Sequence, residues 1–597
     1  MKKTEAARSG HARFASPVMK RPTTLLRYVR WCRQGWRRFP PGLPAGVLLI
    51  CALLAGCAAS GTRPGDSTTP AQWQAEQIAA LDQAQRIYDR AQRQPGLLAQ
   101  DEFMRHAGHQ HAGAAFTVIF GQYQNWYDGF MGSYLRAQRK FSIAQPLPPG
   151  AAASPLVRSG TWRAVPALVA IPRLARGYRA VFLNEDHTNP ETRSLTVALL
   201  SRLRRDGFNT FAAETLYAQG IAGLRRRGHA TDGSGFYTRE PVYAEMVRTA
   251  LRLGYRVIAY EAAAGAHAGT REAGQAANLD RRAFAGHPDA RLVVNAGFAH
   301  IEKHGRYLGG HSMAEDFMRR TGIDPLVIEQ TMLTGHLRRS YDSPYWRAVI
   351  DALHPRQPIV FLDARGRPWS LLPRRYDVSV FFPRERVADG RPTWLGLWGL
   401  RVPKTVPAGL CRGHYPCLLE ARPPGEPRKA VPADRTLLRC AAEQRALWLR
   451  PGAYALIAVD EADQVVGRIT LQARADTPLP RGTPATDDRA MACHPLMQVL
   501  CNCLVILSAA KDLRSEASGL PGHRRRSSSH RPAMEREPVA RQILRPAASG
   551  RQQERKGLSP LSAAKGLSLS DAHSPPMQRP QSRDSRRRRT TPLKTQR

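Results

Sequence analysis

The sequence is poor in acidic residues. It has 48 Asp and Glu against 89 Lys and Arg, which gives a formal net charge of +41. Such an excess would ordinarily indicate a polyanionic partner. Much of the excess, however, lies in the first 57 residues and in the tail after Pro484. The charge therefore describes the two ends of the chain better than the part between them, and no nucleic-acid partner is expected for the protein.

The sequence also lacks the Gly-x-Ser-x-Gly pattern of a serine hydrolase. The nearest approach, Gly233-Ser234-Gly235, lies in a loop between two helical stretches. That loop has no strand-turn-helix context, which the nucleophilic serine of such enzymes requires. A serine nucleophile is therefore not expected.

No apolar run at the start of the chain is long enough to span a bilayer, because a core of about 30 Å takes roughly 20 residues. Instead, seven basic and no acidic residues between Met19 and Arg38 precede a shorter apolar stretch, 42–55, and then Gly56-Cys57. This order is typical of a secretory leader. Leu54-Ala55-Gly56-Cys57 resembles the lipobox of bacterial lipoproteins, which implies lipidation of Cys57 and cleavage before it. By the same resemblance, Ala58 after the lipidated cysteine implies the outer membrane, with the protein facing the periplasm.

Nine cysteines fall in three groups, in the leader, the body and the tail. The body group is Cys411, Cys417 and Cys440. Because an exported chain meets an oxidising compartment, two of these three are expected to form a disulfide. One odd thiol would then remain.

After the leader (1–57), the composition divides the chain into further parts. Residues 58–70 are rich in Ser, Thr, Gly and Pro, as a tether is, and 71–150 have a helical pattern. Three histidines in that helical segment, His106, His109 and His111, are spaced unsuitably for one helix face. A metal site there is the less favoured interpretation of them.

Residues 155–340 change to short apolar runs that alternate with helical stretches. This alternation predicts an α/β fold with a parallel sheet and flanking helices. The expected strands are 180–183, 210–213, 257–260, 292–295 and 326–328, and the expected helices are 191–206, 242–253, 271–284 and 313–320.

Residues 341–480 predict a small β-rich domain, with strands at 376–382 and 394–402 and a hairpin of 454–459 and 465–472. Residues 481–597 are biased towards Arg, Ser, Pro and Gly and predict a disordered tail. The repeat of Leu507–Leu513 at Leu561–Leu567 suggests read-through sequence, with a polyanion-binding arm as the alternative.

Acids and histidines follow successive strands of the predicted sheet. Glu185 and His187 come after the first strand, Glu214 after the second, Glu261 after the third, and His300 after the fourth. Because ligands sit at the carboxyl ends of parallel strands, we expect these side chains to meet at one edge. Such groups hold a divalent metal or act as a general acid and base.

These residues resemble the superfamily of the haem-uptake lipoprotein ChaN, the erythromycin esterases and the Tiki and TraB-type proteins. Gly297-Phe298-Ala299-His300 matches one of its two Gly-x-x-His motifs in full. Asn184-Glu185-Asp186-His187 matches the other with Asn for Gly. Glu214 fits the acid after the second strand, and Arg271 fits the arginine that opens a later helix.

The resemblance implies a hydrolase of an ester or amide bond, whose catalytic residues would be Glu185, His187, Glu214, Arg271 and His300. Glu185, His187, Glu214 and His300 would also be the ligands if the enzyme used a divalent metal. The alternative is a haem- or metal-binding uptake lipoprotein without catalysis, in which Tyr260 and His304 join the cofactor site. A scaffold with a decayed site is the third interpretation. The expected partners are a small-molecule or peptide substrate in the cell envelope and the membrane, through the lipid anchor.

Overall fold

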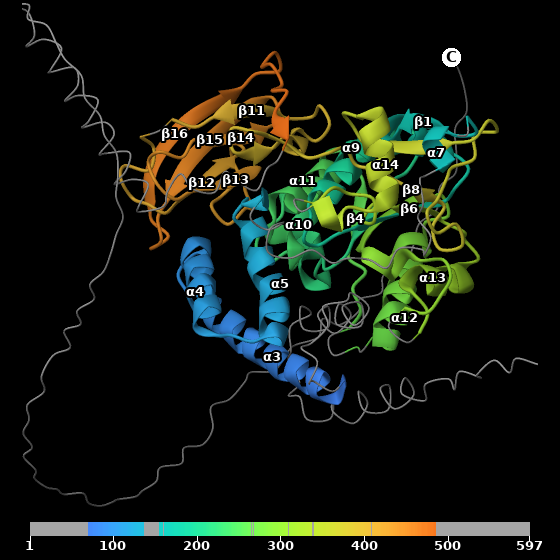
Figure 1. Ribbon diagram of the computed structural model, residues 1–597, viewed down its shortest axis with the longest axis horizontal. Helices are drawn as coiled ribbons and strands as arrows, with labels where there is room; N and C mark the ends of the chain where they lie inside the picture. The colour runs from blue at the N-terminus through green and yellow to red at the C-terminus, as the bar shows by residue number, and fades with distance from the viewer. Residues whose placement is uncertain are drawn as a thin grey trace, which may run out of the picture. The chain divides into compact units, whose positions relative to one another are not determined.

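Figure 1 shows the protein as a computed structural model, in which residues 70–135, 155–158, 160–263, 266, 268–307, 310–336, 339–407 and 409–484 are described. The leader with Cys57, the tether before residue 70 and the tail after residue 484 lie outside the described residues. In the described part, no helix combines the length and apolarity needed to cross a membrane.

The first described elements are three helices in the segment expected to be helical, α3 (Pro70–Ala91), α4 (Leu97–Gln110) and α5 (Ala114–Phe130). The aromatic residues of α5 are mostly buried, and Phe116 stacks on Phe120 with ring centroids 4.9 Å apart. The histidines of this segment have separate partners. His106 lies 2.9 Å from the Gln110 amide and His111 2.9 Å from that of Gln83.

The α/β part is built on a six-stranded parallel sheet in the order β4-β3-β5-β2-β6-β8. Five of these six strands are buried along their whole length, which explains why the longer ones are mostly apolar in sequence. The strands are β2 (Ala180–Glu185), β3 (Thr210–Ala213), β4 (Arg256–Ile258), β5 (Leu292–Gly297), β6 (Leu326–Glu329) and β8 (Val378–Ser379). The predicted fold class is confirmed.

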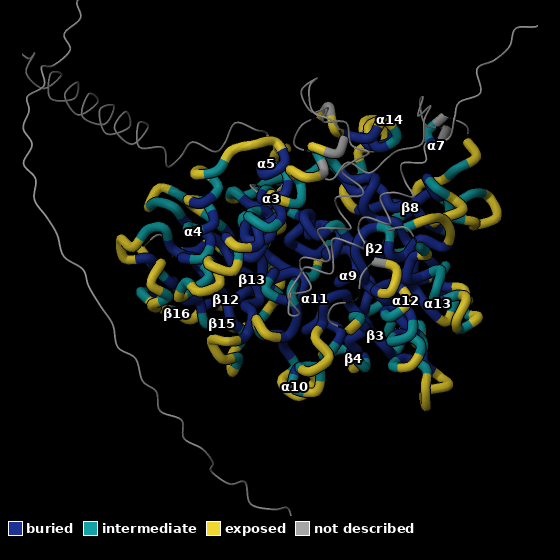
Figure 2. The backbone as a smooth tube through the Cα atoms, turned by 90° about the horizontal axis from the view of Figure 1, so that it is seen from below, coloured by how far each residue is buried: buried dark blue, intermediate teal, exposed yellow. Residues whose placement is uncertain are grey.

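Helices cover the two faces of this sheet, and alternate strand residues enter two different cores. In β2, Val181 and Leu183 belong to the first core, whereas Ala180 and Phe182 belong to the second. The first core includes residues of α8 (Ala167–Ala175), α9 (Glu191–Arg205) and α11 (Pro241–Arg252). The second includes residues of α12 (Ala268–Leu279), α13 (Met313–Thr321) and α14 (Pro344–Leu353). Figure 2 shows α9 and α11 largely in the dark blue of buried residues.

Shorter elements complete this part: α7 (Pro155–Arg158), α10 (Ile221–Arg227), the strand pair β1 (Arg163–Pro166) and β7 (Ile359–Leu362), and the single turns η2 (Ala218–Gly220), η3 (Tyr237–Arg239), η4 (Asp280–Phe284), η5 (Phe298–Ile301) and η6 (Arg339–Tyr341). Local sequence explains several ends. Glu240 accepts hydrogen bonds from the first backbone amides of α11, where Pro241 opens the helix. Gly228 and Gly322 end α10 and α13 in left-handed backbone conformations.

The region predicted as β-rich differs from expectation at two places. Of 376–382 only Val378–Ser379 is a strand, and it joins the parallel sheet beside β6, so the α/β part extends past residue 341. The run 394–402 is mostly not a strand, because Thr393–Gly396 forms the turn η7 and Leu397 and Trp398 have positive φ angles. Aromatic and apolar content alone suggested strands there, whereas the backbone turns sharply.

The antiparallel part contains the sheet β13-β12-β15-β16 and smaller sheets. The predicted hairpin is confirmed as β15 and β16. The strands are β9 (Arg386–Ala388), β10 (Arg391–Pro392), β11 (Val402–Thr405), β12 (Cys417–Arg422), β13 (Asp434–Leu438), β14 (Ala446–Leu449), β15 (Gly452–Val459), β16 (Val465–Ala473) and β17 (Thr483–Pro484). Cys411 and Cys417 form the expected disulfide. Cys440 is also disulfide-bonded, so it is not the odd thiol that the sequence predicts.

Helix α11 ties the antiparallel part to the α/β part through buried charges. Glu245 lies 2.6 Å from Arg450 and 3.3 Å from Arg401, and Arg248 makes two hydrogen bonds to Glu426. The N-cap of the same helix, Glu240, accepts a hydrogen bond from Tyr134 just beyond α5. The helical and antiparallel parts therefore both support α11, and α11 begins beside the strand ends described next.

Candidate active site

The first strand of the predicted site carries a histidine held by a glutamate. Glu185 is the last residue of β2, and its Oε1 lies 3.0 Å from His187 Nδ1. Arg193, on α9, donates two hydrogen bonds to the same carboxylate at 2.8 and 2.9 Å, and Asn295 donates another. The Glu185 carboxylate can only accept hydrogen bonds, so the Nδ1 of His187 carries the proton and donates it to this bond. The other nitrogen, Nε2, is then the basic one.

The second acid, Glu214, follows β3 and is bound by an arginine and the backbone. Arg271 Nη2 donates to its Oε1 at 2.7 Å, and the backbone N–H of Gly297 donates to its Oε2 at 2.6 Å. Arg271 also makes two 3.0 Å hydrogen bonds to Glu261, which follows β4. His187 Nε2 lies 3.8 Å from Glu214 Oε2, too far for a direct hydrogen bond. Nε2 and Glu214 therefore face each other without being bonded.

The second histidine, His300, lies in η5 after β5 and has both ring nitrogens engaged. Its Nδ1 is 2.8 Å from Glu272, the acidic residue of α12, and its Nε2 is 3.1 Å from Arg271 Nη1. Glu214 Oε1 is 3.4 Å from the same Nε2. His300 thus holds Arg271 and Glu214 in place. His187 is the histidine whose Nε2 has no close hydrogen-bond partner among the described residues.

All five residues predicted as catalytic lie in this cluster: Glu185, His187, Glu214, Arg271 and His300. The glycine of the matched motif has a steric role in it. Gly297 has ordinary extended backbone angles, but a β-carbon there would lie 2.1 Å from His187 Nε2 and 3.1 Å from Glu214 Oε2. Only glycine leaves room for the imidazole. At the degenerate motif, Asn184 instead bonds Phe298 O and the Gln330 N–H across neighbouring strands.

Replacing Gly297 with alanine is expected to displace His187 and to lower the hydrolysis implied by the resemblance by about 10²-fold, since a shift of about 1 Å has that effect. Overpacking should cost about 1–3 kcal/mol of unfolding free energy. Hydrolysis kinetics and urea denaturation measure the two effects. Gly177→Ala is the matched control, because nothing lies within 4 Å of a β-carbon there. Equal activity in both variants would contradict the steric role.

The charges of the cluster hold its carboxylates ionised. Burial by itself would raise the pKa of Glu185, but Arg193 and the hydrogen bond from His187 lower it to about 2. Burial likewise opposes ionisation of Glu214, and His300, Arg271 and His187 together lower its pKa far below the usual range. Burial would lower the pKa of His300, yet Glu272 and Glu214 raise it.

The lowered pKa of Glu185 predicts acid sensitivity. Its contribution to stability is present above the ordinary glutamate pKa near 4.5 and is lost as the pH falls towards 2. The shift corresponds to about 3 kcal/mol. Denaturant titrations at pH 5, 4 and 3 should therefore show a steeper loss of stability for the wild type than for Glu185→Gln. Glu76→Gln, at an exposed position, should behave like the wild type. Parallel curves for wild type and Glu185→Gln would refute this assignment.

The predicted metal ligands Glu185, His187, Glu214 and His300 come together, but their arrangement does not fit a cation. Within the described ranges, no group of three or more His, Cys, Asp or Glu side chains is placed to hold a metal ion. Arg193 hydrogen-bonds Glu185, and Arg271 hydrogen-bonds Glu214. Arg271 Nη1 also lies 3.1 Å from His300 Nε2. A metal ion would have to displace a guanidinium, so no step below is derived through a metal.

The two residues predicted for a haem site differ in their surroundings. Tyr260 is fully buried, and its hydroxyl donates to the backbone oxygen of Asn295 at 3.3 Å. His304 is exposed. Nothing in their placement favours an axial ligand.

Two residues that the sequence interpretation did not single out, Arg193 and Tyr237, belong to the cluster. Arg193 binds Glu185 and also donates to Glu240 at 3.2 Å. Tyr237 stacks on the His187 ring, with centroids 4.3 Å apart and an interplanar angle of 18°. Arg193 follows Glu185 by eight residues. An arginine in the first turn of the helix that follows a strand ending in an acid could have indicated this ion pair from the sequence. Tyr237 had no such signal, because it lies in a long loop.

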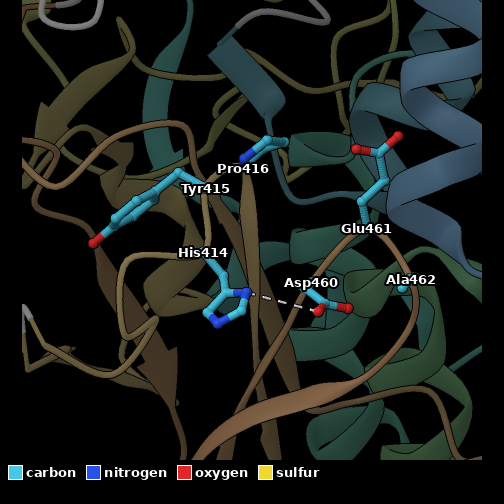
Figure 3. A pocket seen from close by; sticks show the side chains of 6 residues that line it. All are labelled: His414, Tyr415, Pro416, Asp460, Glu461 and Ala462. Atoms are coloured by element: carbon cyan, nitrogen blue, oxygen red, sulfur yellow. Dashed lines mark ion pairs between the residues drawn. The ribbon is translucent and has the colours of Figure 1, made fainter.

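A separate hollow of about 270 Å³ lies on the antiparallel part (Figure 3). It is lined by His414, Tyr415, Pro416, Asp460, Glu461 and Ala462. The loop closed by the disulfide and the turn between β15 and β16 form its walls. His414 is more than half exposed and lies 3.9 Å from Asp460. No residue of the cluster borders this hollow, and a solvated ion pair supplies no chemistry.

Comparisons with known proteins give no family for the chain. No family model matches, and no curated protein matches. Solved structures align only weakly. The type III effector HopBA1 is 14% identical, with 26% of this chain and 84% of that chain covered and a TM-score of 0.21. The C-terminal region of Pasteurella multocida toxin is 10% identical, with 32% and 27% covered and a TM-score of 0.18. The toxin effector domain RRSP of Vibrio vulnificus is 13% identical, with 45% and 65% covered and a TM-score of 0.21.

Proposed function

We propose that the protein is a hydrolase of the cell envelope that cleaves an ester or amide bond with water. The observation that carries the proposal is the Glu185–His187 pair, in which the carboxylate binds Nδ1 and leaves Nε2 as the base. A histidine oriented in this way by a buried acid is a general base. The resemblance to the erythromycin esterase and ChaN superfamily supports the same interpretation.

In this reaction His187 Nε2 takes a proton from water, and the water oxygen forms a bond to the carbonyl carbon. Glu214 faces the same position and stabilises the positive charge that develops on His187. When the tetrahedral intermediate collapses, the bond to the leaving group breaks and the proton passes from His187 to that group. Arg271 and His300 position Glu214, because each lies within 3.4 Å of its Oε1.

The site is closed in this conformation. The side chains of His187 and His300 are each 2% exposed, whereas that of Glu261 is 15% exposed. A substrate therefore reaches His187 after side chains over it move, with Glu261 marking the more open side. Tyr237, which covers the His187 ring, is one such side chain.

We also propose that the chain is anchored in the outer membrane through Cys57 and faces the periplasm. The leader motif is the basis of this proposal, and the disulfide between Cys411 and Cys417 supports an oxidising compartment. Labelling of expressing cells with a fatty-acid analogue tests it. Incorporation should be lost in Cys57→Ser and kept in Cys51→Ser. Labelling of both variants would refute the anchor.

The test of the catalytic proposal is hydrolysis of a panel of p-nitrophenyl esters and p-nitroanilides by the full-length protein. Turnover should exceed the buffer rate and should remain after treatment with EDTA, because arginines occupy the acidic groups. Loss of turnover with EDTA and recovery with Zn²⁺ or Mn²⁺ would favour the metal-dependent alternative. Absence of turnover on the whole panel would contradict the proposal.

A further inference from the structure

Tyr237 is the aromatic residue closest to the proposed base. It lies in η3, three residues before Glu240, the N-cap of α11, and its ring is nearly parallel to that of His187. Its backbone N–H donates to the Thr215 hydroxyl at 3.3 Å. Thr215 follows Glu214 and has a φ angle of +64°, which is uncommon for a β-branched residue. A strained turn after one acid thus holds Tyr237 over the histidine.

The hydroxyl of Tyr237 is buried and has no hydrogen-bond partner in the described part of the chain. The residue is 1% exposed. Two other buried tyrosines beside the cluster differ, because Tyr243 donates to the backbone oxygen of Glu214 and Tyr260 to that of Asn295. Leaving a buried donor unpaired destabilises a fold. An acceptor from outside the chain would satisfy this one.

The surroundings of the hydroxyl keep it a donor. Burial, and then the charges of Glu214 and Glu185, raise the pKa of Tyr237 well above its usual value. Both carboxylates are therefore close enough to act on the phenol electrostatically, although neither hydrogen-bonds it. The guanidinium of Arg193 lies 5.3 Å from the ring centroid and fixes the ring from another direction.

We infer that Tyr237 is a further catalytic residue, whose hydroxyl donates a hydrogen bond to the carbonyl oxygen of the ester or amide that His187 attacks with water. The inference rests on the proposed function. When water adds to the carbonyl carbon, the π-electron pair moves to the carbonyl oxygen, and the Tyr237 O–H stabilises the resulting oxyanion. Collapse returns that pair to form the carbonyl and expels the leaving group. The tyrosine keeps its proton throughout.

A donor of this kind suits an uncharged carbonyl substrate better than a phosphate ester. Five carboxylates, those of Glu185, Glu214, Glu240, Glu261 and Glu272, surround two arginines and two histidines. An added dianion would meet this excess of negative charge at short range. We therefore expect carboxylic esters or amides to be cleaved, and p-nitrophenyl phosphate to be left intact.

The test compares Tyr237→Phe with Tyr260→Phe in the full-length protein, using the p-nitrophenyl ester that the wild type cleaves best. Tyr237→Phe keeps the stacking ring and removes one oxyanion donor, so kcat should fall by about 10²-fold or more with little change in KM. Its melting temperature should equal or exceed that of the wild type, because an unpaired buried hydroxyl is removed. Tyr260→Phe should melt lower and keep most of kcat.

The outcomes distinguish a failure of the role of Tyr237 from a failure of the proposed hydrolase function. Hydrolysis by the wild type that Tyr237→Phe leaves unchanged overturns the role of Tyr237 alone. A melting temperature of Tyr237→Phe lowered as much as that of Tyr260→Phe also overturns it, since the hydroxyl then has a partner within the protein. If the wild type cleaves none of the panel, the proposed function fails and this inference fails with it.

Discussion

Replacing His187 with glutamine is expected to lower kcat/KM for ester hydrolysis by about 10³-fold, within the range that a positioned general base supplies. Glutamine retains an amide N–H that can donate to Glu185, so the buried carboxylate keeps a donor in place of Nδ1. What it loses is the basic nitrogen that faces Glu214. The melting temperature should therefore change by only a few degrees, while turnover collapses.

His304→Gln is the matched control for this substitution, because His304 is exposed. Steady-state kinetics of the two variants should separate the base from a surface histidine. A His187→Gln protein that unfolds at the assay temperature would be uninformative on catalysis, so circular dichroism accompanies each assay. A folded His187→Gln variant with wild-type kcat/KM would show that His187 is not the base.

Replacing Arg193 with methionine is expected to be the most destabilising single change in the cluster, by about 3–5 kcal/mol. Arg193 neutralises Glu185 with two hydrogen bonds and Glu240 with a third. All three side chains are buried, so methionine would leave carboxylates in the interior without their cation. Urea denaturation at pH 7 measures the loss. Arg205→Met, at an exposed position of the same helix, should be nearly neutral.

The double variant Arg193→Met with Glu185→Gln separates charge from packing. Because glutamine removes one of the two stranded charges, the double variant should be more stable than Arg193→Met alone. If both variants are equally destabilised, the loss comes from packing of the arginine and not from the buried carboxylates. The electrostatic account of the cluster would then be wrong.

The central strands were predictable because they are buried on both faces. Thr210–Ala213 is a strand with the predicted bounds, and Leu292–Gly297 extends two residues past the prediction. A strand covered on both sides has an uninterrupted apolar sequence, which is visible without tertiary information. The run around Tyr376 was assigned to the wrong sheet, because its pairing with β6 depends on contacts 50 residues away.

The site was predictable in part for a similar reason. Residues that directly follow parallel strands must meet at one edge, and this rule alone gathers Glu185, Glu214 and His300. The close contact between His187 and Gly297, by contrast, joins two residues that lie 110 positions apart in sequence. No local pattern encodes that contact, and the same holds for the stacking of Tyr237 on His187.

The most direct test of the account is the rate of ester hydrolysis by full-length wild type, His187→Gln and His304→Gln, measured from pH 5 to pH 9 on one p-nitrophenyl ester. The account predicts turnover well above the buffer rate in the wild type and in His304→Gln. His187→Gln should show only a residual rate about 10³-fold lower. Equal rates in all three folded proteins, or no rate above buffer in any of them, would contradict the claim that Glu185 and His187 form a catalytic base.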